Sequence, residues 1–237
     1  GCTKIDPGCA HCYAETLTKN RMGLDLWGPG ARRQVTADAN WKKPRQWNKE
    51  AAAAGEIRKV FCASLCDVFE DHPTANETRP RLWELVRATP NLHWQILTKR
   101  ADRILPNLPE DWGIDGYPNV WLGVSISEAK GAWRADCLRR IPAVVRFVSY
   151  EPALGPLHHD LDLAGIDWVI YGGESGPGFR GHDLAWPRAM REACAKAGTA
   201  FFYKQSAAPR TEMGIHLDGE LVRKFPTPRL TTAKAWI

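Results

Sequence analysis

The sequence contains no apolar run of the roughly 20 residues that a membrane-crossing helix requires, so we predict no membrane span and no membrane partner. No signal peptide is visible at its start. The chain also lacks internal repeats and coiled-coil heptads. These absences favour a cytoplasmic globular protein over a membrane-embedded, secreted or fibrous one.

Several catalytic signatures are missing as well. We find no phosphate-binding P-loop, no Rossmann glycine fingerprint followed by an acidic residue, and no nucleophile elbow. The histidines beyond the first twelve residues are scattered, and none has the spacing of metal ligands. P-loop, Rossmann-type and α/β-hydrolase chemistries are therefore disfavoured.

The composition is that of an ordinary globular protein. With 237 residues, of which 44% are hydrophobic and 25% charged, the chain can bury the core of one α/β domain. The net charge of +5 is compatible with a polyanionic partner without requiring one. The seven cysteines do not have the spacing of a secreted disulfide scaffold, and their clustering near the start indicates a cytosolic metalloprotein.

Three cysteines lie on one short loop at the start of the chain. Cys2, Cys9 and Cys12 have the spacing Cys-x6-Cys-x2-Cys, and no fourth cysteine lies nearby. Three thiolates can hold a [4Fe–4S] cluster and leave its fourth iron open, where S-adenosylmethionine could bind and be cleaved to a carbon radical. Zinc, with His11 or a distant cysteine as its fourth ligand, and plain free thiols are the alternatives.

Short apolar segments rich in β-formers alternate along the chain with segments of helical character. The predicted strands cover residues 59–65, 94–98, 120–125, 144–149, 168–171 and 200–203. This order predicts βαβ units and a partial, TIM-like (β/α)6 barrel of about six parallel strands in a single domain. Residues 1–58 would form the cysteine loop and a basic, Trp-rich segment, residues 59–205 the barrel core, and residues 206–237 a tail.

Polar or charged residues follow the predicted strands. In an α/β barrel, the carboxyl ends of the strands carry the catalytic groups. The residues at these ends are Ser64, Cys66, Asp67, Lys99, Arg100, Ser125, Glu151, Gly172, Gly173, Glu174 and Lys204. Together they predict a polar cup with the cysteine loop on the same face, although a solvated rim would also be polar.

Six motifs occur together in this chain. They are Gly-Cys-Thr-Lys-Ile-Asp-Pro-Gly-Cys-Ala-His-Cys-Tyr-Ala-Glu at 1–15, Gln-Ile-Leu-Thr-Lys-Arg at 95–100, Trp-Leu-Gly-Val-Ser at 121–125, Glu-Pro-Ala-Leu-Gly-Pro-Leu at 151–157, Gly-Gly-Glu-Ser-Gly at 172–176 and Phe-Phe-Tyr-Lys-Gln at 201–205. With this set, nearly the whole chain resembles a phage-associated family of unknown function that is itself similar to compact radical S-adenosylmethionine enzymes. The Leu-Thr-Lys strand end at 97–99 also resembles spore photoproduct lyase, which repairs a thymine dimer in DNA.

The resemblance implies a [4Fe–4S] cluster bound by the three cysteines, S-adenosylmethionine as cofactor, and an electron donor such as flavodoxin or ferredoxin. A 5′-deoxyadenosyl radical would take a hydrogen atom from a substrate held in the cup. The residues expected to contact the cofactor are Ser64, Asp67, Lys99, Ser125, Glu151, Gly172, Gly173, Glu174 and Lys204. The candidates for the final hydrogen donor are Cys66, Tyr150 and Tyr203. The first cysteine gap has six residues here, whereas the usual superfamily loop has three.

Basic residues interleaved with tryptophans suggest the substrate. Nucleic-acid-binding proteins use such mixtures to pair phosphates and stack bases. The residues concerned are Arg32, Arg33, Trp41, Lys42, Lys43 and Arg45, with Arg100 and Arg180 adding charge at the cup. We therefore expect a nucleic-acid base as substrate, repaired or modified, and DNA rather than RNA; a solvated loop pinned by tryptophan is the alternative.

Two other functions are compatible with the same residues. One is a non-enzymatic iron–sulfur or zinc protein that binds nucleic acid. The other is a barrel hydrolase in which Asp67, Glu151 and Glu174 surround a divalent ion.

Overall fold

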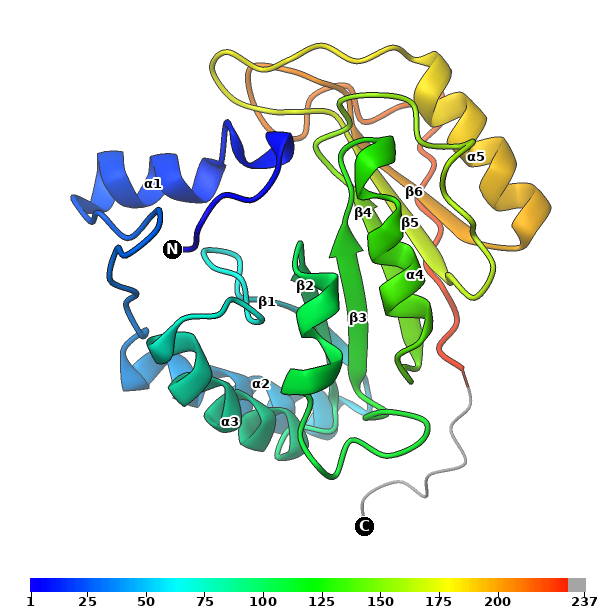
Figure 1. The fold of residues 1–237 in the computed structure, drawn as a ribbon. Coiled ribbons are helices and arrows are strands. Elements are labelled where there is room, and N and C mark those ends of the chain that lie inside the picture. Colours follow the sequence, from blue (N-terminus) through cyan, green and yellow to red (C-terminus); the bar gives the residue numbers. More distant parts are fainter. Residues whose placement is uncertain (230–237) are drawn as a thin grey trace.

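Six parallel strands form one sheet in the order β1-β2-β3-β4-β5-β6. The computed structural model describes residues 1–229. The strands are β1 (Arg58–Cys62), β2 (Leu92–Thr98), β3 (Val120–Ser125), β4 (Val145–Tyr150), β5 (Trp168–Gly172) and β6 (Ala200–Gln205). The sheet curls into a half-barrel that is open between β1 and β6 (Figure 1). The predicted partial barrel is confirmed, although β1 ends at Cys62 rather than at residue 65.

Helices α2 (Asp38–Ala54), α3 (Pro73–Arg87), α4 (Trp133–Arg139) and α5 (Ala185–Ala197) cover the convex side of this sheet. The helix α1 (Tyr13–Met22) stands apart from the sheet and packs on Leu26 and Trp27 (Figure 1). The short 3-10 turns are η1 (Pro7–Cys9), η2 (Ala101–Arg103), η3 (Leu105–Asn107) and η4 (Ala129–Gly131). The helix α3 begins at Pro73. Proline suits the first turn of a helix, and the His72 ring caps it by accepting a hydrogen bond from the Thr74 backbone at 3.2 Å. No helix of residues 1–229 combines the length and apolar character needed to cross a bilayer.

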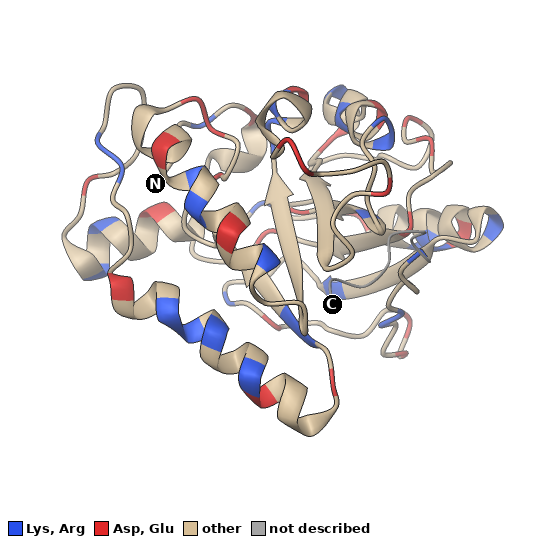
Figure 2. Ribbon diagram, turned by 90° about the horizontal axis from the view of Figure 1, so that it is seen from below, with Lys and Arg blue, Asp and Glu red and all other residues tan. Residues whose placement is uncertain are grey.

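The predicted basic, Trp-rich segment is helical over residues 38–54, so the alternative of a solvated loop pinned by tryptophan does not describe it. Its many lysine, glutamine, glutamate and alanine residues favour helix and outweigh the cost of Pro44 in its second turn. Trp41 lies half-buried against the core, and the Arg81 guanidinium stands 4.5 Å from its ring. The opposite side of α2 is exposed and carries a row of lysine and arginine residues (Figure 2).

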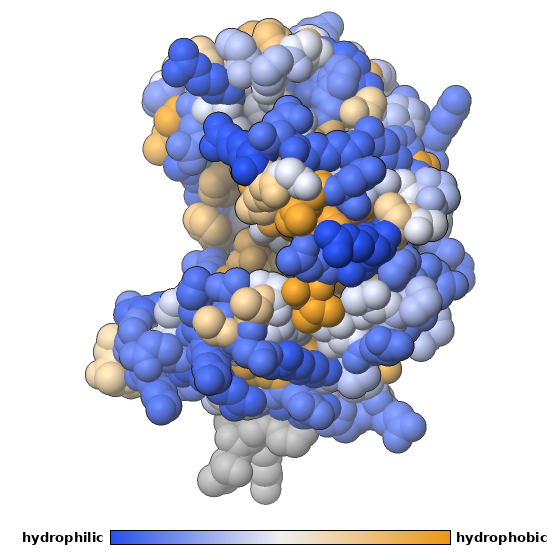
Figure 3. All heavy atoms as spheres, turned by 90° about the vertical axis from the view of Figure 1, so that its left-hand side faces the viewer, coloured by the Kyte–Doolittle hydropathy of each residue, from blue (hydrophilic) through white to orange (hydrophobic). Residues whose placement is uncertain are grey.

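The two faces of the sheet have separate apolar clusters. The helix-covered face holds the main core. On the concave face, Trp121, Phe147, Trp168 and Phe202 form a second cluster, which we call the aromatic floor. Gly123 makes room for it, because a Cβ there would lie 2.3 Å from the Phe147 ring. Above the floor the surface is hollowed between the upper and lower parts of the molecule, with apolar residues inside (Figure 3).

The C-terminal segment closes the lower end of the half-barrel. The Tyr203 backbone N–H donates to the Val222 carbonyl at 2.8 Å, so this segment runs beside β6. Further on, the Phe225 ring packs 5.3 Å from Trp168 of the floor. The last predicted tail residues, 230–237, lie outside the described residues.

Candidate functional site

The cysteine loop crosses the carboxyl ends of the strands, which we call the mouth of the half-barrel (Figure 1). After β1, the Leu65 carbonyl accepts a hydrogen bond from the Gly1 nitrogen at 2.8 Å. After β5, Glu174 Oε2 lies 3.0 Å from His11 Nδ1. The loop is therefore anchored at both ends of the mouth, and its predicted place on this face of the sheet is confirmed.

A buried carboxylate, Glu70, anchors the start of the loop. It accepts a hydrogen bond from the Thr3 backbone at 2.7 Å and binds Arg33 through two nitrogens at 2.7 and 2.9 Å. Burial alone would raise the pKa of Glu70, but the bonds from Arg33 and Thr3 lower it below its usual value. Sequence reasoning missed Glu70, because it follows β1 within a segment that carries no motif. Its partners come from positions 37 and 67 residues away in the chain.

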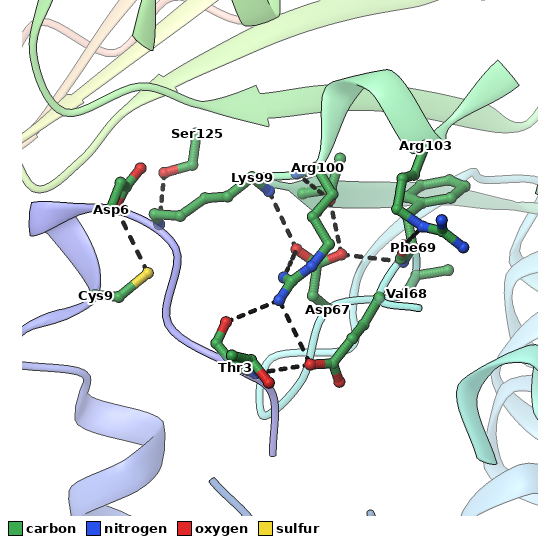
Figure 4. Close-up of polar contacts among 12 residues, drawn as sticks. Thr3, Asp6, Cys9, Asp67, Val68, Phe69, Lys99, Arg100, Arg103 and Ser125 are labelled. Carbon is green, nitrogen blue, oxygen red and sulfur yellow. Dashed lines mark hydrogen bonds and ion pairs between the residues drawn. The ribbon is translucent and has the colours of Figure 1, made fainter. Parts of the chain in front are cut away.

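Asp67 links the exits of β1 and β2 (Figure 4). One oxygen accepts from the Thr98 hydroxyl at 2.7 Å and the Phe69 backbone at 3.0 Å. The other accepts from Arg100 Nη1 at 2.9 Å and the Lys99 backbone at 3.2 Å. The two oxygens of Asp67 accept hydrogen bonds from four protein donors, so the carboxylate acts as a structural anchor. Neither oxygen is left free for the predicted contact with the cofactor.

Two arginines expected to face nucleic acid are turned inward instead. The side chains of Arg33 and Arg100 are 7% and 10% exposed, respectively. Arg100 donates to the Thr3 carbonyl at 2.8 Å, and Arg33 to the Leu26 carbonyl at 3.1 Å. Both guanidinium groups hold the cysteine loop, so a phosphate-binding role does not fit their placement.

The far end of the loop is held by Glu174 and Arg180. Glu174 is 4% exposed and accepts from the Arg180 backbone at 2.8 Å, from Arg180 Nε at 2.9 Å and from Arg180 Nη2. Burial opposes its ionisation, but the bonds from Arg180 and His11 prevail and lower the pKa of Glu174 to about 2. Arg180 also donates to the Pro7 carbonyl at 3.1 Å, so this predicted nucleic-acid contact is also engaged with the loop.

Arg134, which the sequence did not single out, fixes the middle of the loop. Its guanidinium lies 2.6 Å from Asp6 and 2.9 Å from the Ser125 carbonyl. The adjacent Gly8 packs so closely that a Cβ would lie 2.2 Å from the Ser127 hydroxyl oxygen. Arginine side chains from four separate parts of the chain, Arg33, Arg100, Arg134 and Arg180, thus position a loop that has no regular structure of its own beyond one 3-10 turn.

The three loop cysteines are half-buried free thiols. Burial raises the pKa of Cys2 to about 12, and Cys9 Sγ lies 3.5 Å from Asp6. Within residues 1–229, no three His, Cys, Asp or Glu side chains converge as they would around one metal ion. Three thiolates on one loop are the donor set that a [4Fe–4S] cluster with an open iron uses, whereas a tetrahedral zinc would need a fourth ligand.

Four side chains line the mouth on the concave face, and we call them the polar rim: Lys99, Ser125, Glu151 and Lys204. The Lys99 ammonium donates to the Ser125 hydroxyl at 2.9 Å, and that hydroxyl donates to the Glu151 carbonyl at 3.0 Å. Lys204 lies 2.7 Å from the Glu151 carboxylate, with side chains 41% and 25% exposed. The structure therefore brings four of the predicted cofactor contacts together. Lys99, Glu151 and Lys204 are partly open to solvent, whereas Ser125 is buried.

The glycines before Glu174 are required by protein packing. A Cβ on Gly173 would lie 2.1 Å from the Ala207 nitrogen, and one on Gly172 would lie 2.8 Å from the Glu151 carboxyl carbon. The space expected for a ligand at these glycines is filled by the protein itself. Ser64, the remaining predicted contact, is exposed, and its carbonyl accepts from the Tyr13 hydroxyl at 2.7 Å.

Two of the three predicted hydrogen donors lie on the other side of the sheet. Tyr150 and Tyr203 are buried under the helices, where their hydroxyls bond Gly155 and Ser206. Strand residues alternate between faces, so these tyrosines point away from the polar rim and direct transfer to a ligand there does not fit their placement. Cys66 is exposed on the loop after β1, and its role as donor stays a prediction.

The remaining predicted nucleic-acid contacts are accessible. Arg32, Lys42, Lys43 and Arg45 are exposed, the last three on α2. Trp47 on the same helix is 39% exposed. Their exposure is compatible with phosphate binding and equally with a solvated helix face.

A curled sheet of six parallel strands, with a three-cysteine loop fixed across its mouth, defines an α/β half-barrel protein with a candidate metal-cofactor site. The chain belongs to the family described as "Protein of unknown function (DUF5131)", whose model matches residues 1–226. No curated protein and no solved structure matches the chain.

Proposed function

We propose that this protein is a radical S-adenosylmethionine enzyme that acts on a nucleic-acid base. The observation that carries the proposal is the three-cysteine loop, whose free thiols are fixed across the mouth of a parallel half-barrel. The resemblance of its motifs to compact members of that superfamily supports the same function.

Cys2, Cys9 and Cys12 would hold the cluster. When bound, a [4Fe–4S] cluster with an open iron supplies one electron to the sulfonium of S-adenosylmethionine. The anchors described above let the loop keep its place at the mouth. A flavodoxin or ferredoxin would deliver the electron.

The polar rim would orient the cofactor. Glu151 is half-exposed and can accept hydrogen bonds from an ammonium or ribose hydroxyl, while Lys99 and Lys204 can pair with a carboxylate. Below the rim, three rings of the aromatic floor, Trp121, Phe147 and Trp168, are buried, whereas Phe202 is half-buried. These rings would shield that side of a cofactor held at the rim from water.

The substrate part of the proposal depends on charge and exposed aromatic surface. The exposed basic side of α2, with the partly exposed Trp47, can pair phosphates and stack a base (Figure 2). The likeness of the strand end at 97–99 to spore photoproduct lyase favours DNA as the polymer.

The test is anaerobic reconstitution with iron and sulfide, followed by dithionite and S-adenosylmethionine. The proposal expects about four irons per chain, a brown protein and the formation of 5′-deoxyadenosine. Cys9→Ala should abolish both the colour and the product, whereas Cys137→Ala, a cysteine on α4 away from the loop, should retain both.

Two outcomes would contradict the proposal. A correctly loaded cluster with intact S-adenosylmethionine would favour a non-enzymatic iron–sulfur protein. If Cys9→Ala still converted the substrate, the hydrolase would be favoured. Asp67 and Glu174 are, however, already paired with arginines rather than arranged around an ion.

A further inference from the structure

Two buried hydrogen-bond donors beside the cysteine loop have no partner within residues 1–229. They are the Ser127 hydroxyl and the Nε–H of Arg134. Both residues are almost fully buried, with 2% and 5% of their surfaces exposed, respectively. Buried polar groups are normally hydrogen-bonded, so each unpaired donor indicates an acceptor that the chain itself does not supply.

The Ser127 hydroxyl lies directly against the residue that precedes Cys9. A Cβ on Gly8 would stand 2.2 Å from the hydroxyl oxygen and 3.1 Å from Asp6 Oδ1. The same Asp6 oxygen accepts a hydrogen bond from Cys9 Sγ at 3.5 Å (Figure 4). Ser127, Asp6 and Cys9 therefore lie around the Gly8 backbone in the middle of the loop.

The backbone of Ser127 is fixed, so its hydroxyl is free only to rotate. β3 ends two residues earlier, at Ser125 of the polar rim. The Ser127 carbonyl accepts a hydrogen bond from the Leu154 backbone at 2.9 Å, and the Ile126 backbone donates to the Ser149 carbonyl at 2.9 Å. Ser127 is thus held beside the cysteine loop, two residues beyond the polar rim.

A bound cluster would supply the missing acceptor. The Cys9 thiol donates to Asp6, but a thiolate bound to iron has no proton and can only accept. The sulfurs of an iron–sulfur cluster also accept hydrogen bonds. Sulfur acceptors would therefore arrive at the part of the loop that the two unpaired donors flank.

We propose that the Ser127 hydroxyl donates a hydrogen bond to a sulfur of the bound cluster at Cys9, and that this bond raises the reduction potential of the cluster. This inference rests on the proposed function and assigns one residue to the tuning of its cofactor. Reduction adds negative charge to a cluster, so a donor at a sulfur stabilises the reduced form more than the oxidised form. Arg134 also holds Asp6 and the Ser125 carbonyl, so of the two donors Ser127 is the one that can be removed without releasing the loop.

The test is an anaerobic redox titration of reconstituted wild type and Ser127→Ala without S-adenosylmethionine, followed by electron paramagnetic resonance of the reduced cluster. At equal iron content, Ser127→Ala should make reduction roughly three- to ten-fold less favourable, the effect of losing one hydrogen bond. At about 59 mV per tenfold change for one electron, the potential should fall by about 30 to 60 mV. The matched control is Ser206→Ala, whose hydroxyl bonds Tyr203 at 2.7 Å on the helix-covered side of the sheet; this change should leave the potential unchanged.

Urea unfolding of the cluster-free variants separates this role from a structural one. The Ser127 hydroxyl has no partner within the described residues, so Ser127→Ala should keep the wild-type unfolding midpoint or raise it. Ser206→Ala breaks a bond inside the protein and should lower the midpoint.

Three outcomes would overturn the inference. One is an unchanged or raised potential in Ser127→Ala at wild-type iron content. Another is a loss of stability in cluster-free Ser127→Ala as large as that in Ser206→Ala, which would show that the Ser127 hydroxyl is bonded within the protein. The third is wild-type protein that takes up no iron–sulfur cluster, which would overturn the proposed function as well. A loaded cluster that leaves S-adenosylmethionine intact would contradict the proposed function alone, because the potential is measured without that cofactor.

Discussion

Replacing Glu174 with glutamine should destabilise the protein and alter its response to acid. Glu174 is 4% exposed and is held by Arg180 and His11, which keep its pKa at about 2 instead of the usual 4.5. At about 1.4 kcal/mol per pH unit, this difference corresponds to about 3 kcal/mol of native-state stabilisation at neutral pH. Arg180 is 35% exposed and can regain water after the change, so we expect a loss of about 2 to 3 kcal/mol.

The sign of the pH dependence follows from the lowered pKa. The stabilisation is complete above the unfolded-state pKa of about 4.5 and is lost as the pH falls towards 2. The difference in free energy of unfolding between wild type and Glu174→Gln should therefore be largest at pH 7 and should shrink between pH 4.5 and pH 3. Urea unfolding of the cluster-free protein, followed by circular dichroism at each pH, measures both quantities.

A surface ion pair supplies the matched control. Glu220 lies 2.7 Å from Arg191, with side chains 64% and 40% exposed. Exposed pairs contribute less than about 1 kcal/mol, so Glu220→Gln should change stability little at any pH. If Glu174→Gln were as stable as wild type, or if its deficit stayed constant down to pH 3, the assigned charge pairing would be wrong.

Three further predictions concern packing, the buried anchor and the tyrosines. Gly173→Ala should lower the free energy of unfolding in urea by about 1 to 3 kcal/mol, because its Cβ would lie 2.1 Å from the Ala207 backbone. Gly181→Ala, where nothing lies within 4 Å, should leave stability unchanged, and equal effects of the two changes would refute the steric argument. Glu70→Gln should lower stability by about 3 kcal/mol because it breaks a buried ion pair, and an unchanged unfolding midpoint would contradict this. Burial raises the pKa of all five tyrosines above 10. Phenolate absorbance should therefore stay low in native protein at pH 10 and appear on unfolding, and the free energy of unfolding should fall as the pH rises above 10. Full ionisation of the tyrosines in native protein at pH 10 would contradict their burial.

The strands and their order could be predicted because each is a short apolar run of β-formers followed by a polar residue. The face of the sheet to which each strand residue points could not be predicted from the sequence. β4 is buried along nearly its whole length and lacks the strict apolar–polar alternation that reveals which face a residue points to, so Tyr150 and Glu151 looked equally suited to the mouth. One step along the strand places Tyr150 under the helices and Glu151 on the rim. The Glu70 anchor could not be predicted either, because its buried ion pair with Arg33 is a tertiary contact that no local sequence pattern encodes.

The charges of the mouth fall into two groups that differ in what a ligand can do to them. Asp67, Glu70 and Glu174 are buried and paired with arginines, so a ligand could reach any of these carboxylates only by displacing its arginine. The bridge between Glu151 and Lys204 is half-exposed, and opening it costs little because water or a ligand can replace either partner. A zwitterionic ligand that carries an ammonium and a carboxylate could pair with both ends at once. The strand exits that looked alike in the sequence thus separate into a rigid frame for the cysteine loop and one exchangeable ion pair at the polar rim.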